Sequence, residues 1–142
     1  MKYCAKKECC THDVIAKLEA WDVPEAEREF ILQRLVSEIF VDDARYARLY
    51  VSEKWILNLW GRIKIVSGLK QKNLDEKIIS DALQLIDEKE YLNVLRLLIS
   101  KKWTETTAEN AEEKKRSALM YALNKGFEEE LILEIIETQI AN

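Results

Sequence analysis

Glycine and proline are scarce in this sequence of 142 residues, which contains three glycines and one proline. A protein built from many short strands needs turn residues between them, so the shortage excludes most all-β architectures and favours long helices joined by short connections. The sequence also lacks the run of roughly 20 apolar residues that a membrane-spanning helix requires, and no signal-peptide pattern opens it. These absences predict a soluble, cytoplasmic, all-α protein without a membrane partner.

Cysteine and histidine are few and lie near the start of the chain, at Cys4, Cys9, Cys10 and His12. An odd number of cysteines in a cytosolic protein argues against a disulfide framework. Thiolate and imidazole groups are natural zinc ligands, so a metal-dependent or catalytic protein using Cys4 to His12 is one hypothesis. The chain offers no second cluster of paired ligands, no phosphate-binding glycine loop and no nucleophile beside His12. We therefore predict a protein with no metal, no cofactor and no enzymatic activity.

The charge is unevenly distributed along the chain. A formal net charge of −4 disfavours nonspecific nucleic-acid binding by the whole surface. Yet the segment 54–72 contains no acidic residue, whereas acidic residues gather at 75–90 and in the C-terminal third. This segment carries five positive charges, at Lys54, Arg62, Lys64, Lys70 and Lys72. A local basic face on an acidic protein predicts a surface for a specific partner.

Three short stretches of the sequence repeat one another, at 21–25, 72–76 and 125–129. The second residue of each is Asp22, Asn73 or Gly126, and these residue types adopt the left-handed backbone conformation most readily. An apolar residue follows each of these three directly. This is expected where a helix ends and the next side chain folds back on its last turn. The acidic residues that come next suit the start of a new helix. Each stretch therefore predicts a tight corner between two helices.

The helices on both sides of each corner repeat as well, because apolar residues recur there at helical spacing. The matching positions before the corners are Val14, Ile15 and Leu18, then Ile65, Val66 and Leu69, then Ala118, Leu119 and Ala122. We predict three three-helix units, at 1–41, 42–86 and 87–142, with a short leading helix at 2–9 and a polar loop near 104–111. Units of this size gain stability by packing in series, which predicts a curved, elongated helical array.

The segment 40–51, Phe-Val-Asp-Asp-Ala-Arg-Tyr-Ala-Arg-Leu-Tyr-Val, resembles the most recognisable motif of the RecX family of regulatory proteins. The segments 60–65 and 69–74 follow in the family's order and separation, and 125–127 is similar to its third-unit corner. The similarity runs from about residue 10 to residue 140. Asn73 stands where the family commonly has glycine. The segment 8–11 lacks the arginine that the family usually carries there, and most of the family's leading segment is absent.

The resemblance implies a monomeric protein that binds the RecA recombinase filament on single-stranded DNA. Members of the family inhibit strand exchange and co-protease activity and limit or disassemble the filament, which links them to homologous recombination, DNA repair and the SOS response. Binding that favours an incompetent filament would act without covalent chemistry. A second hypothesis is a helical protein that binds DNA directly through the basic segment 54–72, because three-helix units also occur in DNA-binding proteins.

Several side chains allow two interpretations. Lys54, Arg62, Lys64, Lys70 and Lys72 are the candidate filament-binding residues, although a basic helix face can also be merely solvated. Asp42 and Asp43 are predicted to cap a helix rather than to form a catalytic pair of carboxylates. The aromatic residues Tyr46, Tyr50 and Trp55 are predicted to pack between units, and Trp60 to be partly exposed.

Overall fold

The computed structural model describes residues 9–37, 41–107 and 109–140. Within these ranges the chain forms helices and no strand, which confirms the predicted all-α fold. The helices are α2 (Thr11–Ala20), α3 (Glu25–Ser37), α4 (Asp43–Ile56), α5 (Arg62–Lys70), α6 (Glu76–Leu83), α7 (Glu88–Glu105), α8 (Ala111–Asn124) and α9 (Glu129–Ile135), which a π-helical turn (Ile136–Ile140) extends. Most of the predicted leading helix at 2–9 lies outside the described residues.

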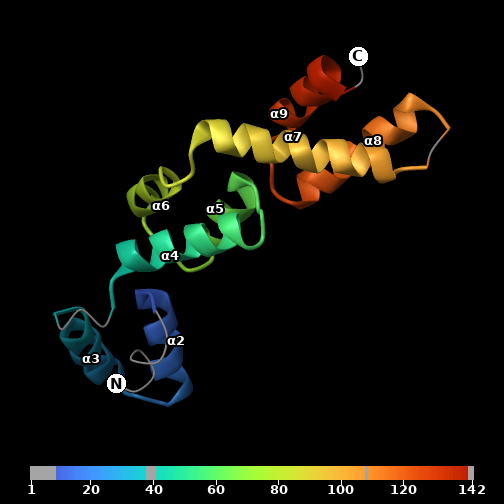
Figure 1. Cartoon of the computed structure of the whole chain (residues 1–142). Helices are drawn as coiled ribbons and strands as arrows, with labels where there is room; N and C mark the ends of the chain where they lie inside the picture. Colours follow the sequence, from blue (N-terminus) through green and yellow to red (C-terminus); the bar gives the residue numbers. More distant parts are fainter. Residues whose placement is uncertain (1–8, 38–40, 108, 141–142) are drawn as a thin grey trace.

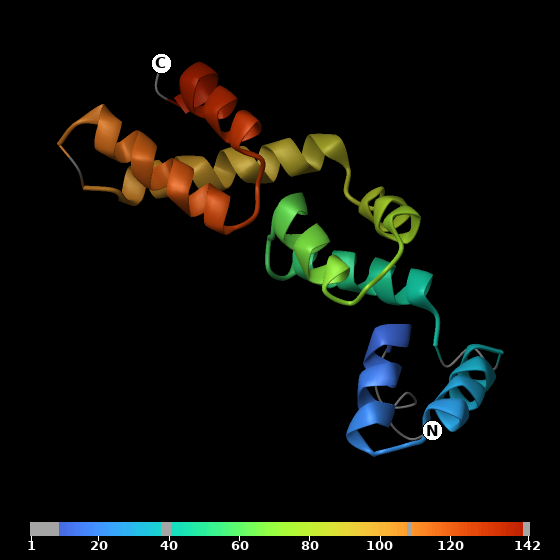
Figure 2. The same cartoon turned by 180° about the vertical axis from the view of Figure 1, so that it is seen from behind.

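The helices form an elongated, bent array in which groups follow one another in chain order (Figures 1 and 2). Helices α2 and α3 lie at one end, α4, α5 and α6 in the middle, and α7, α8 and α9 at the other end. This arrangement confirms the predicted helical repeat array. Helix α7 includes the first two positions of the predicted loop at 104–111, and α8 begins at its last. The three-unit boundaries themselves remain a prediction.

The backbone confirms the three predicted corners. Asp22, Asn73 and Gly126 have φ angles of 56°, 57° and 96°, in the left-handed region. At the first corner the amide of Val23 donates to the carbonyl of Leu18 at 3.0 Å, which closes the end of α2. This hydrogen bond is the one expected where a left-handed residue ends a helix. The composition of the corners therefore specified the backbone conformation there.

The two aspartates at the start of α4 are bound to backbone amides. The carboxylate of Asp42 accepts from the amide of Arg45 at 3.0 Å and caps α4, as predicted. That of Asp43 accepts from the amide of Thr11 at 2.7 Å, so it caps α2 rather than its own helix. Since the first amides of a helix have no partner within it, each aspartate satisfies a donor that would otherwise be left open. Asp43 thereby joins α4 to α2.

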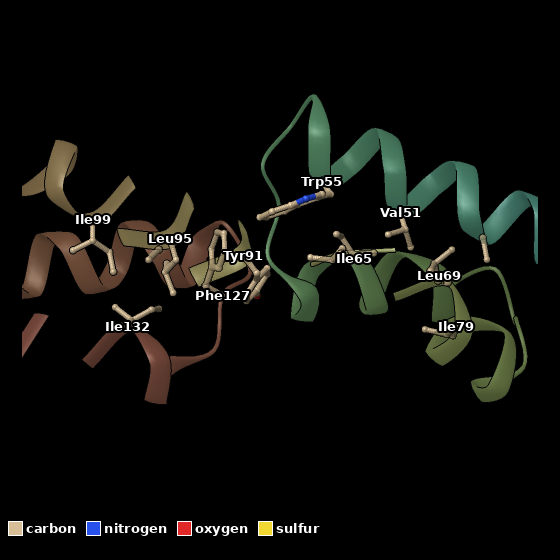
Figure 3. Packing of buried hydrophobic residues seen from close by; sticks show 14 of the residues in the cluster. Val51, Trp55, Ile65, Leu69, Ile79, Tyr91, Leu95, Ile99, Phe127 and Ile132 are labelled. Atoms are coloured by element: carbon tan, nitrogen blue, oxygen red, sulfur yellow. The ribbon is translucent and has the colours of Figure 1, made fainter. Parts of the chain in front are cut away.

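Two separate hydrophobic clusters hold the array together. The larger one runs without a break from α4 to the end of the described chain, and Figure 3 shows its central part. The smaller one lies between α2 and α3 and contains Val14, Leu18 and Leu35. Trp55 is buried in the larger cluster, and Tyr46 and Tyr50 pack against it partly buried, as predicted for core aromatics. Burial of apolar surface is the main favourable term in folding, so α4 to α9 depend on one shared core.

Candidate functional site

The five basic residues of the segment 54–72 do not form one continuous face. Arg62 turns toward α7 and α9, whereas Lys72 turns toward α2. Lys54 and Lys64 lie against Trp60. Helix α5 carries three of the five residues within nine positions, and side chains at such spacing point in different directions around a helix. The basic segment therefore contributes to three different places.

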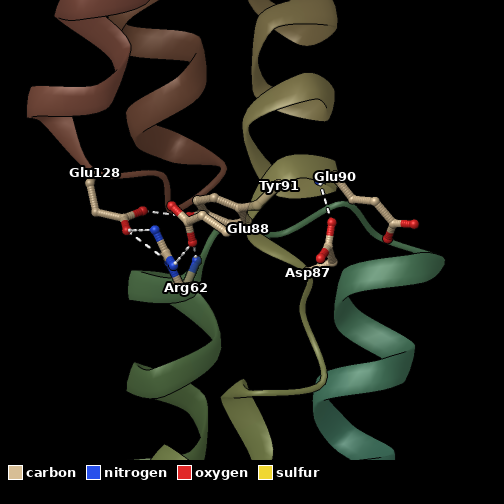
Figure 4. Close-up of polar contacts among 6 residues, drawn as sticks. All are labelled: Arg62, Asp87, Glu88, Glu90, Tyr91 and Glu128. Atoms are coloured by element: carbon tan, nitrogen blue, oxygen red, sulfur yellow. Dashed lines mark hydrogen bonds and ion pairs between the residues drawn. The ribbon is translucent and has the colours of Figure 1, made fainter.

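Arg62 joins the middle group of helices to the last group (Figure 4). Its Nε donates to Oε2 of Glu128 at 2.8 Å, and its Nη1 donates to Oε2 of Glu88 at 2.8 Å. Its guanidinium also lies over the ring of Tyr91, with Cζ 4.0 Å from the ring centroid. Burial alone would lower the pKa of Arg62, but the hydrogen bonds and charges of Glu88 and Glu128 outweigh it and raise that pKa. Each charged neighbour of Arg62 thus belongs to another helix of the array.

Tyr91 is the buried centre of this junction. Its hydroxyl accepts from the amide of Arg62 at 3.0 Å and donates to the carboxylate of Glu128. Its ring packs against those of Trp55 and Phe127, at centroid distances of 5.3 and 5.1 Å. Burial first, and then the hydrogen bond to Glu128, raise the pKa of Tyr91. A buried hydroxyl with both functions satisfied fixes the start of α5 against α7.

The backbone comes into direct contact at the same junction. The amide of Gly61 donates to the carbonyl of Lys125 at 2.7 Å, and the amide of Ile63 donates to that of Gly126 at 2.9 Å. A Cβ atom at Gly61 would overlap the backbone of Gly126 and Phe127. Only glycine permits this approach, because any larger residue places an atom where the other chain segment lies.

Lys72 forms the corresponding contact with α2. Its Nζ lies 2.5 Å from Oδ1 of Asp13, whose side chain is 8% exposed. Beside it, Nδ2 of Asn73 lies 3.1 Å from Nδ1 of His12. Burial would raise the pKa of Asp13, but the hydrogen bond and charge of Lys72, together with hydrogen bonds from Cys10, hold that pKa below its ordinary value. The ion pair is therefore part of the joint between α2 and α5.

We expect a Lys72→Met variant to lose stability at neutral pH and to lose less of it in acid. A carboxyl whose folded pKa is depressed stabilises the fold above its unfolded pKa, about 3.9, and that contribution disappears as the pH falls through the folded value. Urea unfolding of wild type and variant at pH 7 and at pH 3 measures the difference. The exposed Lys101 gives the control Lys101→Met, for which we expect no such pH dependence. An equal loss at both pH values would contradict this role of Asp13.

Lys54 and Lys64 gather around Trp60. Their Nζ atoms lie 4.9 and 4.3 Å from the centroid of its ring, at distances typical of cation–π contacts. Lys125 reaches the same turn between α4 and α5, where its Nζ donates to the carbonyl of Asn58 at 2.6 Å. Lys125 belongs to the third corner and lies 67 positions from Asn58, so the basic segment 54–72 gives no indication that it joins this cluster. Trp60 is half-buried, in keeping with the prediction of partial exposure.

Lys70 is exposed and borders an open groove along α5 with a volume of about 590 Å³. Ile63 and Val66 supply apolar lining, and Arg62 stands at its other end. Of the five predicted residues, Lys64 and Lys70 are the exposed ones.

Cys9 and Cys10, the two cysteines that the structure describes, are buried. Both side chains lie in the interior, and burial raises the pKa of Cys10 to about 11. No group of three or more potential ligands is brought together in the part of the chain that the structure describes, from which Cys4 is missing. Nor does any described helix combine the length and apolar character needed to cross a membrane.

Comparison with known proteins identifies a family with this architecture. The family model described as "RecX, second three-helix domain" matches residues 42–83. The regulatory protein RecX of Clostridium acetobutylicum is 30% identical in an alignment of 122 positions that covers 78% of this chain and 56% of that protein. A RecX crystal structure superimposes with a TM-score of 0.86 at 25% identity over 96% of this chain and 68% of that one. The chain belongs to the RecX family.

The RecX fold extends over the whole described chain. RecX from Lactobacillus salivarius superimposes with a TM-score of 0.87 over 99% of this chain and 90% of that one, at 24% identity. The chain spans about half the length of the curated RecX relatives it matches. The regulatory protein RecX of Lactobacillus johnsonii, for example, is 25% identical, and the match covers 92% of this chain and 48% of that protein. All five predicted basic residues fall within the matched range 42–83, whereas Lys125 lies outside it.

Proposed function

We propose that this protein binds RecA filaments on single-stranded DNA and inhibits or limits their recombinase and co-protease activity. The observation that carries the proposal is membership of the RecX family, whose named relatives are regulatory proteins. The protein would act as a cytoplasmic monomer, without catalysis and without a cofactor. Its place would be in homologous recombination, DNA repair and the SOS response.

The shape of the molecule supports a filament as the partner. A filament repeats the same surface along its length, and an elongated helical array can contact more than one repeat at once. The junction around Arg62 and Gly61 holds the middle and last groups of helices in one arrangement. A protein that binds one filament state more tightly than another shifts the population toward it without chemical change.

Direct DNA binding is the second candidate, favoured by the three lysines Lys54, Lys64 and Lys125 near Trp60. Each lysine that neutralises a phosphate releases counterions, so such binding would weaken steeply as salt is added. It would also be measurable without RecA. The overall charge of −4 opposes this alternative, because it repels a polyanion from most of the surface.

We expect this protein to inhibit the single-stranded-DNA-dependent ATPase activity of the RecA of its own species at substoichiometric to stoichiometric dose. The measurement titrates the protein into preformed filaments, with serum albumin at equal mass as the control. Fluorescence anisotropy with a labelled oligothymidylate, at two salt concentrations and without RecA, separates the two candidates. Inhibition with weak oligonucleotide binding supports the filament proposal. An ATPase rate unchanged at a tenfold excess of protein would refute it.

A further inference from the structure

The turn between α4 and α5 presents two large apolar side chains to solvent. Ile56 is 66% and Leu57 is 76% exposed, although both follow directly after the buried Trp55. Leu59 has a φ angle of 54°, which a leucine adopts only at a cost in free energy. The amide of Trp60 donates to the carbonyl of Lys54 at 3.0 Å and holds the turn closed. A strained turn that exposes apolar side chains is typical of a contact surface.

Three parts of the chain each contribute a lysine beside this turn. Lys54 comes from the end of α4, Lys64 from α5, and Lys125 from the corner before α9. Burial first, and then the charge of Lys64, lower the pKa of Lys125, as expected when two ammonium groups lie close together. In the described part of the chain neither Lys64 nor Lys125 has a carboxylate within ion-pair distance. The fold thus brings three cations together, and among the described residues only Lys54 of the three has a carboxylate, Glu53, within ion-pair distance.

The cluster is also held firmly in place. Gly61 and Lys125 are joined through the backbone at 2.7 Å, so the α4–α5 turn and the third corner move together. The ammonium of Lys125 is fixed by the carbonyl of Asn58, and it keeps two N–H groups for a further acceptor. A surface that is ordered before binding loses less conformational entropy when a partner arrives.

We propose that this turn, formed by Ile56, Leu57, Lys54, Lys64 and Lys125, docks a protein segment that carries carboxylates beside an apolar side chain. The inference rests on the proposed function, and it identifies the protein surface of the filament, rather than its DNA, as what this turn contacts. Carboxylates would complement the three ammonium groups, and an apolar side chain would cover Ile56 and Leu57.

The surroundings of the turn favour a protein segment over a nucleic acid. Glu53 lies 3.8 Å from Lys54, and three consecutive glutamates, 128–130, follow Lys125 within a few positions. A phosphate backbone carries a charge at every nucleotide, so Glu53 and this acidic run would repel it. A peptide can place its few charges on the lysines alone. The exposed leucine and isoleucine also offer little to a phosphate backbone.

Two variants test the two halves of this surface, Leu57→Ser for the apolar tip and Lys64→Glu for the charge. Leu85→Ser and Lys77→Glu are matched controls, since both of these residues are exposed and lie away from the turn. Affinity for RecA filaments is measured by cosedimentation. We expect each test variant to bind about tenfold more weakly and both controls to bind like wild type. Wild-type affinity of both test variants would overturn the inference while leaving the proposed function intact.

A second measurement does not depend on RecA. The ¹⁵N-labelled protein is titrated with a peptide of alternating glutamate and leucine and, separately, with oligothymidylate. We expect the peptide to shift amide resonances of residues 56–64 and 125, and the Leu57→Ser variant to reduce these shifts. No shift at these residues, or a stronger response there to the oligonucleotide than to the peptide, would overturn the inference. Failure of the wild type to bind filaments would instead refute the proposed function.

Discussion

We expect a Gly61→Ala variant to lose about 3 kcal/mol of folding free energy, because the added methyl group overpacks a closed contact and weakens two backbone hydrogen bonds. The methyl group would overlap the backbone of Gly126 and Phe127, which has no rotamer to change. To admit it, the start of α5 must move away from the third corner. That movement lengthens the hydrogen bonds from Gly61 to Lys125 and from Ile63 to Gly126.

Urea unfolding followed by circular dichroism measures this loss, and Gly68→Ala is the matched control on the same helix. A Cβ at Gly68 would meet the end of the Tyr50 side chain, which can rotate away. Alanine also gains about 1 kcal/mol over glycine inside a helix, so we expect this control to stay within about 1 kcal/mol of wild type. Equal stability of the two variants would show that the contact at Gly61 can relax to admit a methyl group.

The corners could be predicted from the sequence because each depends on the backbone preference of a single residue. Asp22, Asn73 and Gly126 adopt positive φ angles through their own side chains or the lack of one, without help from distant parts of the chain. The capping of α4 by Asp42 is local in the same way, since donor and acceptor are three residues apart. The φ angle of Leu59 could not be predicted, because nothing in leucine favours it. The backbone hydrogen bonds from Leu59 to Trp55 and from Trp60 to Lys54, which close the end of α4, accompany it.

The arrangement of the basic residues could not be predicted, because it depends on how the helix groups pack. Arg62 meets Glu128 across 66 positions, and Lys72 meets Asp13 across 59. The acid-free segment 54–72 predicts one contact face, yet acidic partners from far along the chain fold back onto both of these residues. Whether any of the five predicted residues contacts a filament remains a prediction.

Substitution of Arg62 tests whether this residue stabilises the fold or contacts the partner. We expect Arg62→Met to lose about 2 kcal/mol of folding free energy, between the values typical of exposed and of buried ion pairs, because the side chain is 28% exposed. Methionine keeps much of the apolar stem but leaves Glu128 with one partner fewer. On α5, Lys70→Met removes the same charge at an exposed position, and we expect it to change stability by no more than about 0.5 kcal/mol.

A double-mutant cycle with Glu128→Gln tests whether the loss comes from this ion pair. If it does, the two substitutions together cost less than the sum of the single ones, by about 1 kcal/mol. Additive losses would place the effect of Arg62 in its contacts with Glu88 and the Tyr91 ring instead. A variant that keeps wild-type stability but no longer inhibits RecA would assign Arg62 to the partner. Because the stability and inhibition of one protein are measured side by side, a loss of inhibition through misfolding is distinguished from the loss of a contact.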